Sequence, residues 1–143
     1  MEHAPPVHAP AANSGAAQID LVLLLLRLIL AVVFGVYGLA KWTEGLGRVA
    51  GFMMSAGIPL PDLAARVSAV LEVGGALLLA LGLWTRAVGV LLAIEMAVAI
   101  WRVVWRQGFI GGYSFELTLI VVAVCLAIAG GGAWSIGRDR LSR

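Results

Sequence analysis

The apolar positions of the chain gather into four long runs, separated by shorter and more polar segments. An α-helix of about 20 apolar residues crosses the hydrocarbon core of a bilayer. Four segments meet this length: residues 20–40, 65–84, 87–106 and 113–132. The pattern therefore predicts an all-α fold, an integral membrane four-helix bundle in which short connections make consecutive spans antiparallel neighbours.

The connection between the first two spans has a helical pattern of its own. Apolar residues recur there at spacings of three and four positions, as in an amphipathic helix: Leu46, Val49, Phe52, Met53 and Ala56. We expect a short helix that lies along the membrane interface. Gly57 and Pro59 would end it.

The two ends of the chain differ in composition from the spans. Residues 1–19 are rich in alanine and proline and contain no lysine or arginine, which predicts a disordered N-terminal tail. Residues 20–137 form the predicted four-span domain, and residues 138–143 form a basic C-terminal tail. Tryptophans occur at or near the span ends, where amphipathic rings prefer to lie: Trp42, Trp84, Trp101, Trp105 and Trp134.

The composition agrees with a membrane protein. Hydrophobic residues make up 62% of the chain and charged residues 13%, against roughly 45–50% and about 25% in soluble domains. The formal charge of +2 includes no basic stripe that would bind nucleic acid. The lipid bilayer is therefore the first expected partner.

Every span carries at least one ionisable residue within or near its apolar zone. The first span has Arg27 and Lys41, the second Glu72, the third Glu95 and Arg102, and the fourth Glu116. A charge at the centre of a membrane helix costs about 2.5–3.5 kcal/mol on insertion scales. We therefore expect these side chains to face the bundle interior and to form pairs there, or to be protonated.

Counting about 1.5 Å of rise per residue places most of these groups in the half of the bundle away from the chain ends. Lys41, Glu72, Glu95, Arg102 and Glu116 converge there. Arg27 lies nearer the other end, and we expect its long side chain to reach toward Glu95. The aromatic residues Trp42, Trp101 and Tyr113 border the same region. The sequence thus predicts a polar pocket that includes Arg27 and opens at this end.

Two interpretations of the cluster stay open. A functional pocket of carboxylates, cations and aromatic rings suits a quinone headgroup or a proton relay. Alternatively, the charges form a buried ion-pair network that fixes helix register, and Arg102 and Arg106 extend to the lipid headgroups.

The only histidines, His3 and His8, lie in the N-terminal tail and Cys125 is the single cysteine. We therefore expect no metal site and no intrinsic cofactor.

Several of these residues resemble the DoxX family of bacterial inner-membrane proteins. The resemblance covers residues 20–137 and rests on Arg27 and Phe34 followed by GLAKW at 38–42, on EVGGALLLALGLWTR at 72–86, and on Glu95 and Glu116. The closing GGGAWSIG is also similar, although Gly137 stands where the family pattern has aspartate. The resemblance implies a small four-helix protein linked to membrane oxidoreductases, including a thiosulfate:quinone oxidoreductase. By position, Arg27, Lys41, Glu72, Arg86, Glu95 and Glu116 are the family-like polar residues.

These observations lead to one functional hypothesis and two alternatives. We expect a subunit or partner of a membrane oxidoreductase system that interacts with quinone through the Glu/Arg/Lys cluster. The alternatives are a small homo-oligomeric transporter or proton relay, and a structural anchor or assembly factor. An enzyme acting alone is disfavoured, because the chain offers no nucleophile–base pair and no metal set.

The expected location is the bacterial inner membrane, with both termini on one side. Arginines near that side are Arg86, Arg138, Arg140 and Arg143, against Lys41, Arg48, Arg66, Arg102 and Arg106 on the other. If Lys41 and Arg102 point into the bundle, the positive-inside rule favours cytoplasmic termini.

Overall fold

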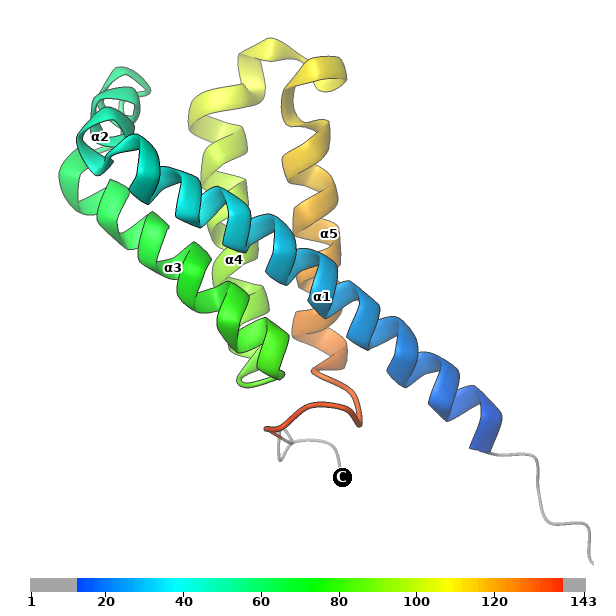
Figure 1. Cartoon of the computed structure of the whole chain (residues 1–143). Helices are drawn as coiled ribbons and strands as arrows, with labels where there is room; N and C mark the ends of the chain where they lie inside the picture. Colours follow the sequence, from blue (N-terminus) through cyan, green and yellow to red (C-terminus); the bar gives the residue numbers. More distant parts are fainter. Residues whose placement is uncertain (1–12, 138–143) are drawn as a thin grey trace, which may run out of the picture.

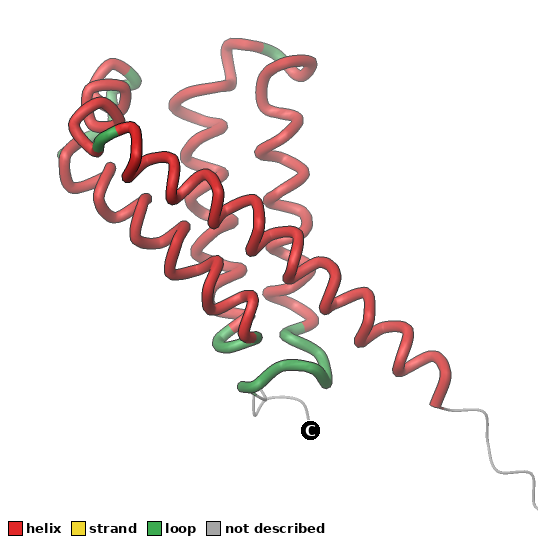
Figure 2. Tube along the Cα trace, in the orientation of Figure 1, coloured by secondary structure: helices red, strands yellow, loops and turns green. Residues whose placement is uncertain are grey.

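The computed structural model describes residues 13–137 and is helical over most of this range (Figures 1 and 2). Its helices are α1 (Asn13–Glu44), α2 (Leu46–Ser55), α3 (Pro61–Leu81), α4 (Thr85–Ala99) and α5 (Ser114–Ala129). Three short helical turns join α4 to α5: η1 (Ile100–Val104), η2 (Trp105–Gln107) and η3 (Phe109–Tyr113).

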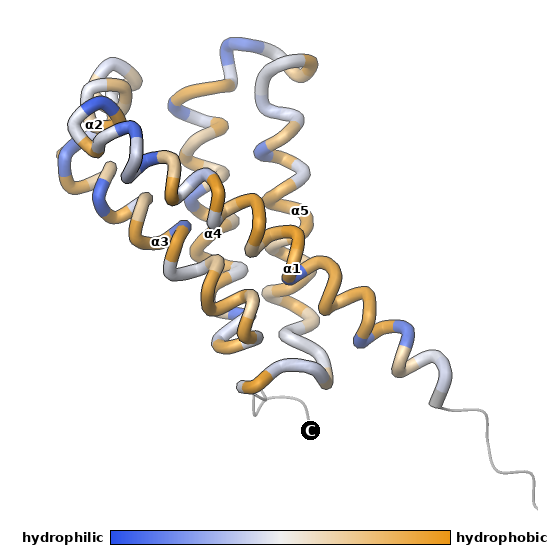
Figure 3. The backbone as a smooth tube through the Cα atoms, in the orientation of Figure 1, coloured by the Kyte–Doolittle hydropathy of each residue, from blue (hydrophilic) through white to orange (hydrophobic). Residues whose placement is uncertain are grey.

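Within residues 13–137, four helical segments are long and apolar enough to cross a membrane: Ser14–Glu44, Pro61–Leu81, Thr85–Gln107 and Phe109–Ala129. The predicted four-span fold is confirmed, and α2 is the short helix expected between the first two spans. Figure 3 shows hydrophobic residues along the spans and hydrophilic residues mainly toward their ends.

The first span starts earlier than the sequence pattern indicated. Helix α1 begins at Asn13, so residues 13–19 are helical and the predicted tail boundary at residue 19 is too late. The helix has 32 residues, which corresponds to roughly 48 Å, whereas the hydrocarbon core is about 30 Å thick. The rest of the predicted N-terminal tail and the basic C-terminal tail, residues 138–143, lie outside the described residues.

The spans associate as two antiparallel pairs that cross each other. Helix α1 lies along α3, and α4 lies along α5, with α2 packed mainly on α3 (Figure 1). Small residues allow the close contacts within each pair. A Cβ atom added at Gly38 of α1 would lie 2.8 Å from Val73 Cγ2 of α3, and one added at Gly89 of α4 would lie 2.7 Å from the Ala123 carbonyl oxygen of α5.

The helix faces that carry the ionisable residues lie toward the interior in the first, second and fourth spans, as predicted. Arg27, Phe34, Glu72 and Ala123 are buried. Large apolar side chains on the opposite faces are exposed, as lipid-facing residues of a membrane bundle would be: Val32, Leu77, Val121 and Ile128 are examples.

The third span departs from its predicted face after Ala99. There α4 passes into the π-helical turn η1, Ile100–Val104. A π-helical turn holds more residues than an α-helical turn, so side chains beyond it are rotated from the face expected at α-helical spacing. Arg102 and Arg106 are exposed for this reason, and Val103 and Val104 face the interior in their place.

Candidate functional site

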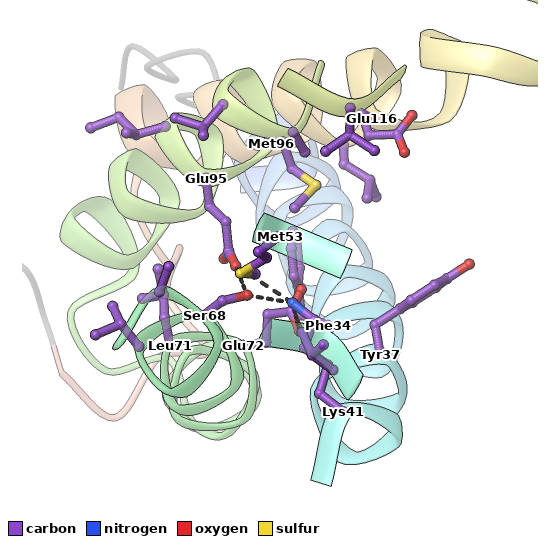
Figure 4. A pocket seen from close by; sticks show the side chains of 18 of the residues that line it. Phe34, Tyr37, Lys41, Met53, Ser68, Leu71, Glu72, Glu95, Met96 and Glu116 are labelled. Carbon is purple, nitrogen blue, oxygen red and sulfur yellow. Dashed lines mark hydrogen bonds and ion pairs between the residues drawn. The ribbon is translucent and has the colours of Figure 1, made fainter. Parts of the chain in front are cut away.

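A cavity of about 550 Å³ lies between the two helix pairs, in the half of the bundle that contains α2. All five α-helices contribute to its walls, which are mostly apolar side chains such as Phe34, Met53 and Met96. Five polar or charged residues from four helices also line it: Lys41, Ser68, Glu72, Glu95 and Glu116 (Figure 4). The volume and this mixed lining are typical of small-molecule sites.

Lys41 is the centre of the polar group. Its Nζ atom lies 2.8 Å from Glu72 Oε2 and 3.8 Å from Glu95 Oε1. It also donates a hydrogen bond to Ser68 Oγ, and the Ser68 hydroxyl donates to Glu95 Oε1 over 2.6 Å. The bonds form a directed chain from the cation through a hydroxyl to a carboxylate, and this chain links α1, α3 and α4 (Figure 4).

Local sequence features bring these groups together. Lys41 lies in the last turn of α1, where the helix dipole favours a cation. Gly38, one turn earlier, lets α1 approach α3 so closely that an added Cβ would lie 2.9 Å from Glu72 Cβ. Ser68 precedes Glu72 by one turn on the same face of α3.

Three buried carboxylate oxygens of cavity residues accept no hydrogen bond from the described residues, and one of them, Glu72 Oε2, pairs with Lys41 as an ion pair. Glu95 Oε2 and Glu116 Oε2 are buried and have no hydrogen-bond partner among the described residues. Leaving a buried polar atom unpaired costs about 1–3 kcal/mol, and more for a charged group. The cavity therefore contains atoms that a suitable ligand or water would stabilise.

Arg27 does not belong to this cavity, so its predicted approach to Glu95 is wrong. Its side chain is 1% exposed and is surrounded by main-chain carbonyls at the opposite end of the bundle. Nε donates to Leu79 O at 3.0 Å, Nη2 to Ala80 O at 3.4 Å, and Nη1 to Gly131 O at 2.6 Å and to Trp134 O at 3.5 Å.

The chain after α5 closes the Arg27 end. The Ile136 amide donates to Leu81 O at 3.2 Å and the Gly137 amide to Gly82 O at 3.3 Å. The Ala133 amide donates to Asp20 Oδ1 at 2.9 Å, which ties the same segment to α1. Arg27 thus bridges the carbonyl end of α3 and the C-terminal segment.

Four other predicted pocket residues also lie elsewhere. Arg102 is exposed, lies 4.3 Å from the centre of the Trp101 ring and donates to Gly57 O at 3.3 Å. Trp42 and Trp101 are exposed near helix ends. Tyr113 stacks on Trp105 with ring centroids 5.4 Å apart, at the turn between α4 and α5. None of the four lines the cavity. Trp42 is exposed in the last turn of α1, and the other three lie in the turns between α4 and α5.

The prediction omitted several cavity residues. Ser68, one turn before Glu72, was not predicted as a partner of Lys41 and Glu95. Tyr37 precedes Lys41 by one turn, and that spacing was the available signal. Met53 on α2 had no signal, because the orientation of a short connecting helix against the spans is not encoded in its own pattern.

The remaining sequence prediction concerned metals. Within residues 13–137, no group of three or more histidine, cysteine, aspartate or glutamate side chains is placed to hold a metal ion.

The fold defines a multi-pass α-helical membrane protein with a cavity of mixed polarity between its helix pairs. The chain belongs to the DoxX family, whose model matches residues 22–105, more than half of its length. It is 38% identical over 107 residues to "Putative oxidoreductase CatD" of Bacillus subtilis (strain 168), which covers 75% of this chain and 78% of that protein.

A second relative carries a name that refers to location. The chain is 38% identical over 77 residues to "Inner membrane protein YphA" of Escherichia coli (strain K12), which covers 54% of each protein. The match therefore spans about half the length of that relative. No solved structure matches the chain.

Proposed function

We propose that this protein is a membrane partner or subunit of an oxidoreductase system and that its cavity binds a quinone headgroup. The observation that carries the proposal is the cavity of about 550 Å³, apolar over most of its wall and polar around Lys41, Ser68, Glu72 and Glu95. A quinone likewise combines a polar ring with an apolar tail. The name of the B. subtilis relative supports an oxidoreductase context.

The residues present fit such a group. The apolar side chains Phe34, Met53 and Met96 offer contacts for a ring and the start of a tail. Bound quinone supplies two-electron, two-proton redox chemistry. The part of this chain would be to orient the ring and to hold protons at Glu95 and Ser68, while a partner protein exchanges the electrons.

Location and assembly complete the proposal. We place the protein in the bacterial inner membrane, consistent with its four apolar spans and with the name of the E. coli relative. We retain cytoplasmic termini and a homo-oligomer as predictions.

A cavity-filling pair of variants tests quinone binding without changing any charge. Ala99 lines the cavity on α4, whereas Ala97 is two residues away and exposed. Ala99→Phe should reduce the quinone that copurifies with the protein by at least about tenfold, because an added ring occupies the ligand volume. Ala97→Phe should copurify with as much quinone as the original protein. Quinone per mole of protein would be measured by mass spectrometry after mild extraction.

Two results would contradict the proposal. The first is the absence of quinone from the unmodified protein, in native extracts and after addition of excess quinone to reconstituted protein. The second is equal quinone content in both phenylalanine variants, which would mean that quinone associates with the lipid-facing surface.

A proton relay is the second candidate, because Lys41, Ser68 and Glu95 form a continuous hydrogen-bond chain. It requires proton flux in liposomes that falls when Ser68→Ala removes the middle of the chain. Unchanged flux in that variant would exclude the relay. A purely structural anchor predicts instead that Ala99→Phe changes protein level and no ligand content.

A further inference from the structure

We infer that the cavity prefers a headgroup that donates hydrogen bonds, the reduced dihydroxy form of a quinone, over the oxidised form, whose carbonyl oxygens only accept. This inference rests on the proposed quinone site and concerns its selectivity. It follows from counting which donors and acceptors in the cavity are already in use.

The polar group offers few free donors. Lys41 donates to Ser68 and meets Glu72 Oε2 at 2.8 Å, and its next acceptor is Glu95 Oε1 at 3.8 Å. The Ser68 hydroxyl has one hydrogen, which it donates to Glu95. The third N–H of Lys41 has no acceptor within hydrogen-bond distance, so it could serve one carbonyl oxygen of an oxidised headgroup. The second carbonyl oxygen would then lack a donor, and Glu95 Oε2 would stay unpaired.

The acceptors are in surplus. Glu95 uses Oε1 for Ser68 and leaves Oε2 buried without a partner, and Glu116 Oε2 is in the same condition. A hydroxyl of a reduced ring could donate to Glu95 Oε2 without breaking any existing bond. When Glu95 is ionised, a hydrogen bond to it contributes more than a neutral one, so this pairing gives the reduced form an advantage.

Tyr37 is the remaining hydroxyl on the cavity wall, and it does not reverse the balance. The residue is 54% exposed, and its ring packs beside Phe115 with centroids 5.9 Å apart. In Figure 4 its hydroxyl points away from the group formed by Lys41, Ser68 and Glu95. A carbonyl held by Tyr37 would therefore leave the unpaired oxygen of Glu95 without a donor.

The test compares one ring in two oxidation states. The full-length protein in lipid nanodiscs would be titrated without oxygen with decylubiquinol and, separately, with decylubiquinone, and empty nanodiscs would correct for partition into lipid. We expect decylubiquinol to bind about tenfold more tightly, the ratio given by one additional hydrogen bond to a carboxylate. Glu95→Gln should reduce this ratio to about threefold or less, because the amide also donates. Glu44→Gln, an exposed position at the end of α1, is the matched control and should keep the ratio.

The outcomes separate this inference from the proposed function. Equal affinities, or tighter binding of decylubiquinone, overturn the preference but leave the quinone site intact. Binding of neither compound overturns both. A full tenfold preference that persists in a folded Glu95→Gln protein overturns the assignment to Glu95. If that variant does not fold, the ratio measured on the original protein alone still decides the preference.

Discussion

Arg27 and Lys41 lie on one face of α1, yet their environments differ in every respect that matters for function. Arg27 is enclosed, and its donors meet four carbonyls from α3 and the C-terminal segment. Lys41 lies beside a cavity, and its carboxylate neighbour Glu95 keeps an unpaired oxygen. A buried charge with a partner at each of its nitrogens holds the fold, whereas one in a partly satisfied group beside a cavity is available to a ligand.

The comparison predicts the largest loss of stability at the closed end. Arg27→Met would remove four hydrogen bonds and leave the Gly131 carbonyl without its donor, whereas Leu79 O keeps the Gly82 amide, at a cost of about 3 kcal/mol in unfolding free energy. Arg27→Lys should recover little of this, because an ammonium group cannot reproduce the planar fork of a guanidinium. Reversible unfolding in mixed micelles would measure both. Arg48→Met, at an exposed position on α2, is the control, and an Arg27→Met protein as stable as this control would disprove the structural role.

The second prediction uses two glycines of the α3 segment. Gly82 has φ +70°, and an added Cβ would lie 2.7 Å from Ser135 and 2.8 Å from Arg27 Cζ. Gly82→Ala should therefore destabilise the protein by about 2 kcal/mol. Gly74 has open space around it within the helix, so Gly74→Ala should be neutral or stabilise by up to about 1 kcal/mol. Unfolding shifts of the same sign and size in both variants would contradict the close packing at the Arg27 end.

The third prediction concerns the ion pair at the open end. Lys41→Met and Glu72→Gln should each destabilise by about 1–2 kcal/mol, less than Arg27→Met, because Lys41 is partly exposed and has other partners. The double variant should lose less than the sum of the single losses, by about 1 kcal/mol. Additive losses in the double-mutant cycle would mean that the 2.8 Å contact contributes no coupling.

The smallest effect is expected at Arg102. Arg102→Ala removes a ring contact and one hydrogen bond at the surface, which together contribute at most about 1 kcal/mol. Quinone content should not change, because the side chain does not line the cavity. A loss of bound quinone in this variant would show that Arg102 contributes to the binding site.

The amino-acid pattern was sufficient for the four spans, for α2 and for the grouping of Lys41, Glu72, Glu95 and Glu116 along one cavity. These features depend on helical periodicity and on the cost of charges in lipid, both of which are local or additive. Arg27 was misplaced because its partners are main-chain carbonyls, which every residue has and no sequence pattern marks. Arg102 was misplaced because one π-helical turn rotates all later positions. The positions of both side chains depend on tertiary structure, which the sequence pattern does not reveal.

The central claim is that a ligand binds at the Lys41 end and that the Arg27 end is closed. A photoreactive azidobenzoquinone, added to the full-length protein in nanodiscs and located by peptide mass spectrometry, tests it most directly. The account predicts labels on cavity residues such as Phe34, Leu71 and Met96, competed by excess unlabelled quinone, and no label on residues 130–137. Competed labelling at the C-terminal segment around Arg27, or labelling that excess quinone does not reduce, would contradict it.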